Sequence, residues 1–288
     1  MCAIPVLEIG GSHITAALVD GAAQTVQESH EVSLPLIAGC EELIGAFIAA
    51  GRSIAAHREA DWGVAIPGPF DYERGIGRFE GVAKFEALNG IDLGAALRPA
   101  LAAAKIRFLN DADAFGIGEA VAGAARGHHR VVCLTLGTGV GSTFIADGYP
   151  VKSGDQVPPD GFVHVLTHSG RDLEDWMSRR ALRRAYAEAT GQDLDVIDIA
   201  GLARAGDPIA VSVWQTALEA MTAAIGPWVR RFGADLVVVG GAIARSWDVV
   251  GPLLTAGFSA ASATVEVVHA QRLDDAALFG AARWAIAP

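Results

Sequence analysis

Apolar residues along the chain follow two alternating patterns, one typical of strands and one typical of helices, and this succession occurs twice. Strands are predicted at residues 3–9, 13–19 and 25–34, and a helix follows at 41–57. Strands are predicted again at 130–136 and 142–146, before another set of helices. Strands first and helices after, in both halves, predict two α/β domains with a cleft between them, where substrates commonly bind.

The remaining elements complete these two halves. The sequence predicts further strands at 62–66, 106–109, 236–239 and 265–268, and an irregular segment at 70–92. It predicts further helices at 93–104, 111–122, 173–190, 196–204, 209–232, 247–257 and 275–286, with a kink at Gly226-Pro227. We expect one domain to comprise residues 1–110 with 272–288, and the other to comprise residues 111–271.

Two segments of equal length carry a matching motif. Residues 7–21 read LEIGGSHITAALVDG, and residues 134–148 read LTLGTGVGSTFIADG. Glycine at the reversal permits φ > 0 and carries no Cβ, so backbone N–H groups can approach an anion closely. Each segment alone reads as an ordinary β-hairpin. Their matched length and shared Asp-Gly ending favour a duplicated fold that holds a polyphosphate from two sides.

Composition excludes several classes of function. At 288 residues the chain exceeds the usual size of one compact core, and its hydrophobic content of 51% is typical of a well-buried globular protein. The net charge of −11 argues against a nucleic-acid partner, because a phosphate backbone requires clustered Lys and Arg. One basic cluster stands out, and we expect it on the solvated face of a helix: Arg179, Arg180, Arg183 and Arg184.

Three scattered thiols, Cys2, Cys40 and Cys133, suit a reducing cytosol and contain no Cys-x-x-Cys pair. The sequence enters a predicted strand at once, without a basic segment and apolar region, so no secretory signal is expected. No stretch was found to approach the ~20 apolar residues that span a bilayer. These features predict a soluble, cytoplasmic protein without a membrane partner.

The order of these pieces resembles the sugar kinases of the ROK family, within the larger sugar kinase, heat-shock and actin ATPase fold, over nearly the whole chain. The resemblance implies an α/β fold of two RNase H-like (actin-like ATPase) domains, each a mixed β-sheet flanked by helices. Residues 8–12 (EIGGS), 136–141 (LGTGVG) and 236–242 (LVVVGGA) resemble its two phosphate motifs and its adenosine motif. The positions implied for nucleotide binding are Gly10, Gly11, Ser12, Gly137, Thr138, Gly139, Gly240 and Gly241.

Glu8 stands where this family has Asp in the first phosphate motif. It keeps the carboxylate on a longer side chain, and the resemblance implies that it holds Mg²⁺ through water. Ser12 replaces the family's Thr and keeps the hydroxyl. The cofactors implied are ATP and Mg²⁺.

Residues 110–119 (NDADAFGIGE) are similar to the family's most specific motif. The resemblance implies that Asp111 is the catalytic base and that Asn110 binds sugar hydroxyls. A sugar hydroxyl is a poor nucleophile, and an ionised carboxylate can accept its proton during attack on the γ-phosphorus. The N-terminus of the predicted helix is expected to keep Asp111 charged. Asp and Asn are also preferred helix caps, so the pair has a purely structural reading as well.

Further sugar contacts implied by the resemblance are Gly68, His164 and Glu174. Gly68 in a Pro-Gly-Pro turn would offer its backbone, although a plain turn explains it equally. Lys84 and Asn89 fall in the same sugar-side loop, where a solvated Lys is the simpler interpretation.

The sequence departs from the family pattern in the loop after residue 159. Gly161 replaces a sugar-binding Glu, so its hydrogen bonds are lost or taken over, for example by Asp160. Ser169 stands where the family has a zinc-binding Cys, and two further Cys are missing, so no zinc site is predicted. Leu173 and Trp176 are expected to pack this loop instead. The intervening segment 162–167 reads as a strand.

The sequence therefore predicts an ATP-dependent kinase of a hexose or amino-hexose hydroxyl, similar to glucokinases and hexokinases. A polyphosphate-dependent glucokinase is one alternative, because such enzymes also carry an Asn-Asp-Ala-Asp-Ala run. A non-catalytic sugar-binding ROK protein is another, given the departures at Glu8 and Gly161. The expected partners are a small-molecule sugar and a nucleotide. A homodimer stays open, because the apolar helix 93–104 suits either an interface or the core.

Overall fold

The computed structural model describes residues 3–35, 38–82, 84–261 and 263–287. The chain divides into two compact units. The first contains the residues up to Ala122 together with those from Asp274 onward, and the second is Gly123–Leu273.

A five-stranded mixed sheet organises the first unit, with strand order β3-β2-β1-β4-β7. Strands β3, β2 and β1 are antiparallel neighbours, whereas β1, β4 and β7 run parallel. The bounds of these strands are β1 Ile4–Ile9, β2 His13–Asp20, β3 Thr25–Ser33, β4 Asp61–Ala65 and β7 Lys105–Leu109. A small hairpin, β5 Phe70–Asp71 with β6 Ile76–Gly77, and the turn η1 Glu86–Leu88 lie in the segment that was predicted to be irregular.

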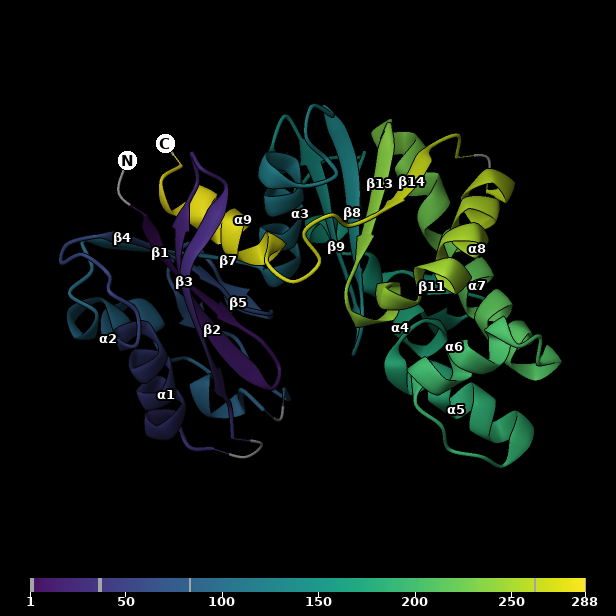
Figure 1. Ribbon diagram of the computed structural model, residues 1–288, viewed down its shortest axis with the longest axis horizontal. Helices are drawn as coiled ribbons and strands as arrows, with labels where there is room; N and C mark the ends of the chain where they lie inside the picture. The colour runs from purple at the N-terminus through teal and green to yellow at the C-terminus, as the bar shows by residue number, and fades with distance from the viewer. Residues whose placement is uncertain (1–2, 36–37, 83, 262, 288) are drawn as a thin grey trace. The chain divides into compact units, whose positions relative to one another are not determined.

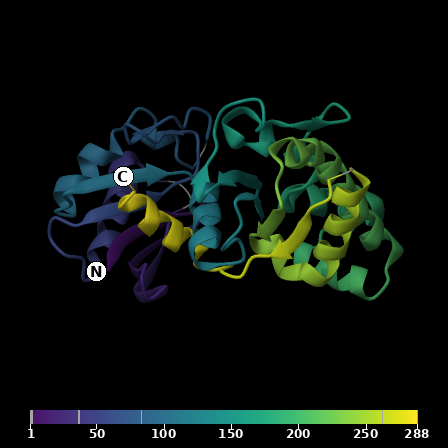
Figure 2. The same ribbon diagram turned by 90° about the horizontal axis from the view of Figure 1, so that it is seen from above.

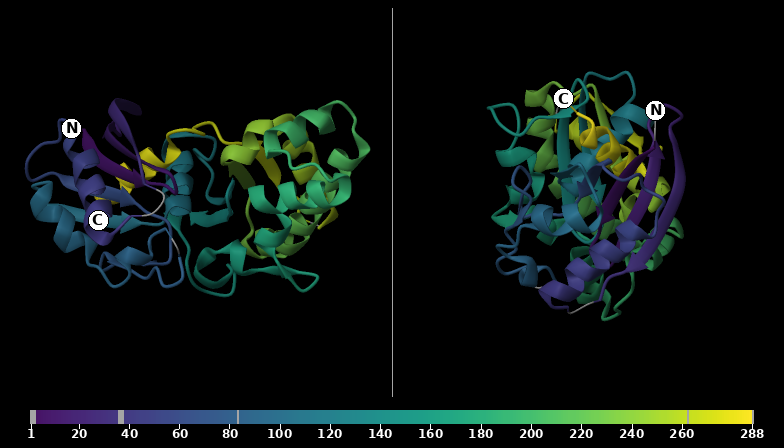
Figure 3. Two further views of the ribbon diagram at one scale, coloured as in Figure 1. Left: turned by 90° about the horizontal axis from the view of Figure 1, so that it is seen from below. Right: turned by 90° about the vertical axis from the view of Figure 1, so that its left-hand side faces the viewer.

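Helices cover this sheet because alternate side chains of its strands point to opposite faces. Leu7 and Ile9 of β1 join the apolar cluster formed with helices α1 (Cys40–Arg52) and α2 (Leu93–Ala100). Figure 3 shows α1 lying along the strands. The C-terminal helix α9 (Ala276–Ala285) contacts β1, β4 and β7. Figures 1 and 2 show this yellow helix beside the strands of the first unit.

Helix α3 (Asp111–Ala122) belongs to the first unit, whereas the sequence placed it at the start of the second. It packs closely on α9, because both helices carry glycine where their backbones meet. A methyl group at Gly118 would overlap the carbonyl of Ala276, and one at Gly280 would overlap the carbonyl of Ala114. The predicted domain boundary at residue 110 is therefore wrong, because the packing of α3 on α9 places α3 in the first unit.

The second unit repeats the strand order of the first. Its sheet runs β10-β9-β8-β13-β14, again with three antiparallel strands followed by two parallel ones. The bounds are β8 Arg130–Leu136, β9 Val140–Ala146, β10 Tyr149–Pro150, β13 Leu236–Gly240 and β14 Glu266–His269. Both sheets thus place their first strand at the centre, and this repeated order agrees with the predicted duplication of an α/β fold.

Five helices form the apolar core of the second unit with the inner strands (Figure 1). Their bounds are α4 Leu173–Trp176, α5 Arg179–Thr190, α6 Val196–Arg204, α7 Pro208–Phe232 and α8 Trp247–Ala260, with the 3₁₀ turn η4 Ala242–Ser246 before α8. The sequence was expected to contain no stretch that approaches a membrane span, but helix α7 is long and apolar enough to cross one by length and composition. It instead buries Trp214, Met221 and Phe232 in this core, and it runs unbroken through Pro227.

Two local predictions in this unit were wrong. The helix expected at 173–190 ends at Trp176 and restarts at Arg179, because the Ser178 hydroxyl accepts a hydrogen bond from the Ala181 N–H and caps the new helix. The strand expected at 162–167 is mostly a 3₁₀ turn, η3 Val163–Val165, preceded by η2 Pro159–Gly161. Strand pairing starts only at β11 Thr167–His168, which pairs with β12 Arg171–Asp172.

Candidate active site

The first glycine-rich hairpin joins β1 to β2. Ile9 pairs with Ile14, and the Gly10 N–H donates to the His13 carbonyl over 2.9 Å. Neither Gly10 nor Gly11 has positive φ, so of the two reasons that the sequence suggested for glycine here the conformational one does not apply. No atom lies within 4 Å of the position that a Cβ of Gly11 would take, so the backbone is open on that side. Ser12 is exposed beside it.

Glu8 lies on β1 just before this hairpin and is partly buried. Burial raises the pKa of its carboxyl to about 7, and the nearby charges of Asp111, Asp275 and Glu31 add to the rise. The carboxylates of these residues therefore repel that of Glu8, which lies just before the hairpin. A bound cation would relieve this repulsion, and a carboxylate is a ligand that Mg²⁺ accepts, so Glu8 fits the water-mediated hold on Mg²⁺ that the resemblance implies.

Asn110 and Asp111 stand at the start of α3, directly after β7. The Asn110 side-chain oxygen accepts from the Ala112 N–H over 3.0 Å, and its carbonyl accepts from Ala114 N–H over 2.8 Å. Asn110 is therefore the helix cap, as predicted for this pair. It is also 6% exposed, whereas Asp111 is open to solvent.

The pKa of Asp111 is raised, although the sequence argument expected the helix N-terminus to keep this carboxyl charged. Surrounding protein atoms raise it most, and the Asp113 charge adds to the rise. The Ala112 N–H, at 2.9 Å from Asp111 Oδ1, acts in the opposite direction, as the helix argument requires. Solvent access limits the size of the net rise. Asp111 is thus placed to take up a proton more readily than an ordinary Asp.

The sequence analysis did not predict the contacts that two residues near these motifs, Tyr72 and Lys84, make in the structure. The Tyr72 hydroxyl accepts from the Asn110 amide over 3.1 Å and lies 3.3 Å from the position of a Cβ at Gly68. Lys84 Nζ donates to the Gly11 carbonyl, so this lysine is bound to the hairpin and is not merely solvated. In the sequence, the Pro-Gly-Pro turn before Tyr72 could have drawn attention to Tyr72. The small number of lysines could have drawn attention to Lys84.

The second hairpin joins β8 to β9. Leu136 pairs with Val140, and Gly137 N–H donates to the Gly139 carbonyl over 3.0 Å. A methyl group at Gly139 would overlap the carboxylate of Glu174. The Val140 N–H also donates to Glu174 Oε1 over 3.1 Å. Glu174, expected as a sugar contact, is therefore held against the second phosphate motif, with Thr138 exposed at its tip.

The third glycine motif lies against this hairpin. Gly240 pairs with Thr135, and Gly241 has φ +84°. A side chain at Gly241 would collide with the backbone of Leu136, the residue before Gly137. The structure thus brings the predicted second phosphate motif and the predicted adenosine motif side by side in the second unit.

The loop of Gly161 and His164 is fixed by Ser142 of β9. The Ser142 hydroxyl donates to the Gly161 carbonyl over 2.8 Å and accepts from the Val163 N–H over 2.9 Å. His164 is exposed, with its ring 5.2 Å from that of Phe162. The structure therefore keeps His164 accessible.

A model of the ROK family matches residues 5–287 of the sequence. The chain belongs to the ROK family. It is 27% identical over 305 residues to a glucokinase of Thermotoga maritima, across 96% of this chain and 95% of that protein. It is 26% identical over 263 residues to an N-acetyl-D-glucosamine kinase of Shigella boydii, across 83% of each.

The fold is that of solved ROK structures. A ROK glucokinase from Streptomyces griseus, crystallised with glucose and AMPPNP, superposes with a TM-score of 0.78 at 24% identity, covering 97% of this chain and 98% of that one. This likeness confirms the predicted fold class of two actin-like α/β units.

This ROK chain packs the loop after His164 with apolar and aromatic side chains, as predicted. Leu173 is fully buried, and Trp176 Nε1 donates to the His168 carbonyl over 3.0 Å. The guanidinium of Arg171 lies 4.1 Å from the centre of the Trp176 ring. Among the residues that the structure describes, no three His, Cys, Asp or Glu side chains lie close enough together to hold a metal ion.

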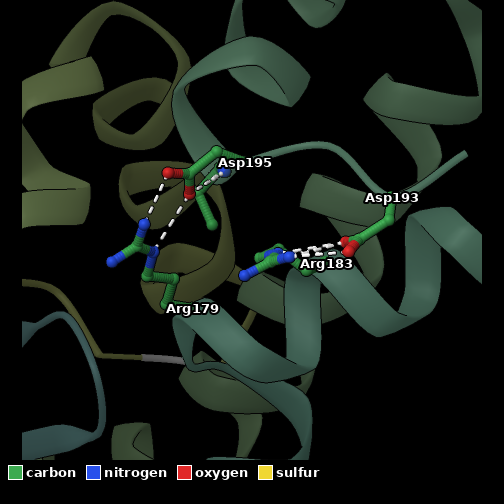
Figure 4. Close-up of polar contacts among 5 residues, drawn as sticks. Arg179, Arg183, Asp193 and Asp195 are labelled. Carbon is green, nitrogen blue, oxygen red and sulfur yellow. Dashed lines mark hydrogen bonds and ion pairs between the residues drawn. The ribbon is translucent and has the colours of Figure 1, made fainter.

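The predicted basic cluster lies on the exposed side of α5. Arg179 Nε donates to Asp195 Oδ1 over 3.0 Å, and Arg183 Nη2 donates to Asp193 Oδ2 over 2.7 Å, as Figure 4 shows. These partners on the following loop neutralise the arginines locally. The cluster is a solvated helix face, as the sequence indicated.

Proposed function

We propose that this ROK protein is a sugar kinase that transfers the γ-phosphoryl group of ATP to a hydroxyl of a hexose or amino-hexose. The observation that carries the proposal is the placement of Asp111 at the start of α3, with a raised pKa and with Asn110 fixed beside it. A base with a pKa above that of an ordinary Asp takes a hydroxyl proton more readily, while solvent access keeps it available to a substrate.

In the proposed reaction the sugar oxygen attacks the γ-phosphorus, its proton passes to Asp111, and the bond from phosphorus to the ADP oxygen breaks. Asn110 would hold the sugar together with the backbone at Gly68, and His164 would offer its accessible ring. Glu174 is engaged with Val140 N–H through one oxygen, so its second oxygen would be the one left for the sugar.

The nucleotide would be bound by backbone N–H groups of both hairpins and by the Gly240-Gly241 motif. Glu8 would hold Mg²⁺, and this ion neutralises phosphate charge when it is bound. The open side of Gly11 and the exposed hydroxyls of Ser12 and Thr138 support this assignment. Burial raises the pKa of Glu8 most, and the nearby carboxylate charges that add to the rise support a cation there.

Replacing Asp111 tests the proposal. In a coupled assay of ADP release with a panel of hexoses and N-acetylhexosamines, Asp111→Asn should lower kcat by about a thousandfold and leave sugar binding by calorimetry within a few fold. Asp113→Asn, the same chemical change two residues away, is the matched control and should retain most activity. Wild-type kcat/KM should fall as the pH is lowered through the raised pKa of Asp111, because the protonated carboxyl accepts no proton. Near wild-type turnover by Asp111→Asn would exclude it as the base.

Two alternatives are separated by the same assays. Offering polyphosphate in place of ATP distinguishes a polyphosphate-dependent glucokinase, for which a net charge of −11 gives little support. Gly161, which has no side chain to offer a sugar, favours the reading as a non-catalytic sugar-binding protein. Sugar binding without any phosphorylated product would support that reading and contradict a kinase.

A further inference from the structure

The side-chain amide of Asn110 is held by two hydrogen bonds of opposite polarity. Its oxygen accepts from the Ala112 N–H over 3.0 Å, and its nitrogen donates to the Tyr72 hydroxyl over 3.1 Å. The two ends of an Asn amide are alike in shape, so only their hydrogen-bond partners decide which end points where. At Asn110 the partners on the nitrogen side are the Tyr72 hydroxyl and the Asp111 carboxylate, whose pKa the Asn110 hydrogen bond lowers.

The Tyr72 hydroxyl determines which end of the amide it meets. A phenol has one proton, and Tyr72 gives it to the Ile66 carbonyl over 3.2 Å. Only a lone pair is then left to face Asn110, so the amide must present its NH₂ group there. A reversed amide would set oxygen against a lone pair and NH₂ against the Ala112 N–H, and both hydrogen bonds would be lost.

The ring of Tyr72 is itself fixed by aromatic packing. Its centre lies 5.3 Å from that of Phe70, which packs in turn on Phe108 at 5.2 Å and on Phe79 at 6.0 Å. Burial raises the pKa of the Tyr72 phenol, the Asn110 hydrogen bond lowers it, and the charges of Asp111 and Asp113 raise it further. The net rise keeps the hydroxyl protonated and therefore able to donate to Ile66.

We propose that Tyr72 is a positioning residue for substrate specificity: it fixes Asn110 so that the NH₂ end of the amide, which also bonds to the Asp111 carboxylate, and not its oxygen, faces the sugar. This inference rests on the proposed function, because it takes Asn110 as a sugar contact. Asn110 then acts only as a donor, so the sugar atom that it contacts must accept a hydrogen bond, as a hydroxyl or carbonyl oxygen does. A sugar that places an ammonium group there is disfavoured.

Tyr72→Phe removes the hydroxyl and keeps the ring, so the Asn110 amide loses the hydroxyl that accepts from its NH₂ group and is oriented less strictly. We expect the KM for sugar, and the sugar dissociation constant from calorimetry, to rise about tenfold. The KM for ATP and kcat at saturating sugar should change less than twofold. In an Asn110→Ala background, Tyr72→Phe should cause no further loss, because its effect passes through Asn110. Tyr186→Phe, at another buried tyrosine in the second unit, is the control and should leave the KM for sugar unchanged.

Wild-type sugar affinity in Tyr72→Phe, or losses that add fully in the double variant, would overturn the inference. A lower melting temperature with unchanged sugar affinity would overturn it as well, since that indicates a structural role alone. If Tyr72→Phe does not fold, a sugar-bound crystal structure of the wild type decides. Asn110 Nδ2 bonded to both Tyr72 and a sugar oxygen supports the inference, and Oδ1 facing the sugar overturns it. A wild type that binds sugar without phosphorylating it contradicts the proposed function instead, and calorimetry still tests Tyr72.

Discussion

In the first hairpin the pairing of β1 with β2 closes at Ile9 and Ile14, so four residues from Gly10 to His13 are left between them. In the second it closes at Leu136 and Val140, with only three residues between them. The sheets around them have the same strand order. Glycine also serves different purposes in the two halves. Gly11 borders open space, while Gly139 and Gly241 leave room for protein atoms. The two halves therefore share a strand order, but glycine leaves open space in the first hairpin and allows close packing of protein atoms in the second half.

The strongest test of this contrast compares a methyl group at Gly241 with one at Gly11. At Gly241 the added carbon would lie closer than 3.0 Å to three backbone atoms of Leu136, at φ +84°. Backbone cannot rotate away as a side chain can, so Gly241→Ala should destabilise the protein by about 3 kcal/mol. Gly11→Ala has free space and ordinary φ, and it should change stability by less than about 0.5 kcal/mol.

Urea unfolding of both variants measures the difference. Gly11→Ala is assessed here for stability alone, since Gly11 is proposed to touch phosphate. Similar losses at the two positions would show that both halves use glycine in the same way, contrary to the structure.

Some features of the fold and of the candidate site could be predicted from the sequence, and others could not. The positions of most strands and Asn110 as a cap follow from short-range patterns, which the sequence displays directly. The position of α3 depends on Gly118 and Gly280 meeting residues of a helix more than 150 positions away in the chain. The contact of Glu174 with Val140 N–H depends likewise on tertiary packing. No spacing in the sequence reveals such contacts.

The second test concerns charge, because Glu8 of the first hairpin aligns with the neutral Thr135 of the second. The pKa of Glu8 is raised from 4.5 to about 7, so the folded state binds this proton more tightly than the unfolded state. Its stabilising contribution is present below about pH 4.5 and is lost as the pH rises to about 7. The shift corresponds to about 3 kcal/mol, which partial solvent access reduces to about 2 kcal/mol.

Glu8→Gln should therefore be more stable than wild type at pH 8.5 by about 2 kcal/mol, and the two should converge near pH 4.5. Unfolding midpoints across this pH range measure the difference. Glu31→Gln is the control, because the charge of Glu31 contributes least to the raised pKa of Glu8, and it should have a much weaker effect. Added Mg²⁺ with nucleotide should stabilise wild type more than Glu8→Gln. A difference that does not change with pH would contradict the raised pKa.

The third test, with the smallest expected effect on stability, compares the Asp-Gly pairs at the ends of the two aligned segments. The two Asp residues have different roles in their turns. Asp20 Oδ1 accepts from the N–H groups of Ala22 and Ala23, over 3.0 and 2.9 Å, so its side chain stabilises the turn. Asp147 and Gly148 both have positive φ, 49° and 83°, and form a two-residue turn between paired Ala146 and Tyr149. Asp147 therefore matters for its backbone conformation.

Substitution by glycine distinguishes a side-chain role from a backbone role. Asp20→Gly loses both hydrogen bonds and should cost about 1 kcal/mol. Asp147→Gly relieves a positive φ and should be neutral within about 0.5 kcal/mol, whereas Asp147→Ala should cost about 1 kcal/mol. The exposed pair of Asp147 with His129, at 2.8 Å, is lost in both Asp147 variants, so comparing them removes its contribution. Equal losses for Asp20→Gly and Asp147→Gly in thermal unfolding would mean that the two turns are equivalent after all, and that the shared Asp-Gly ending reflects one conserved device.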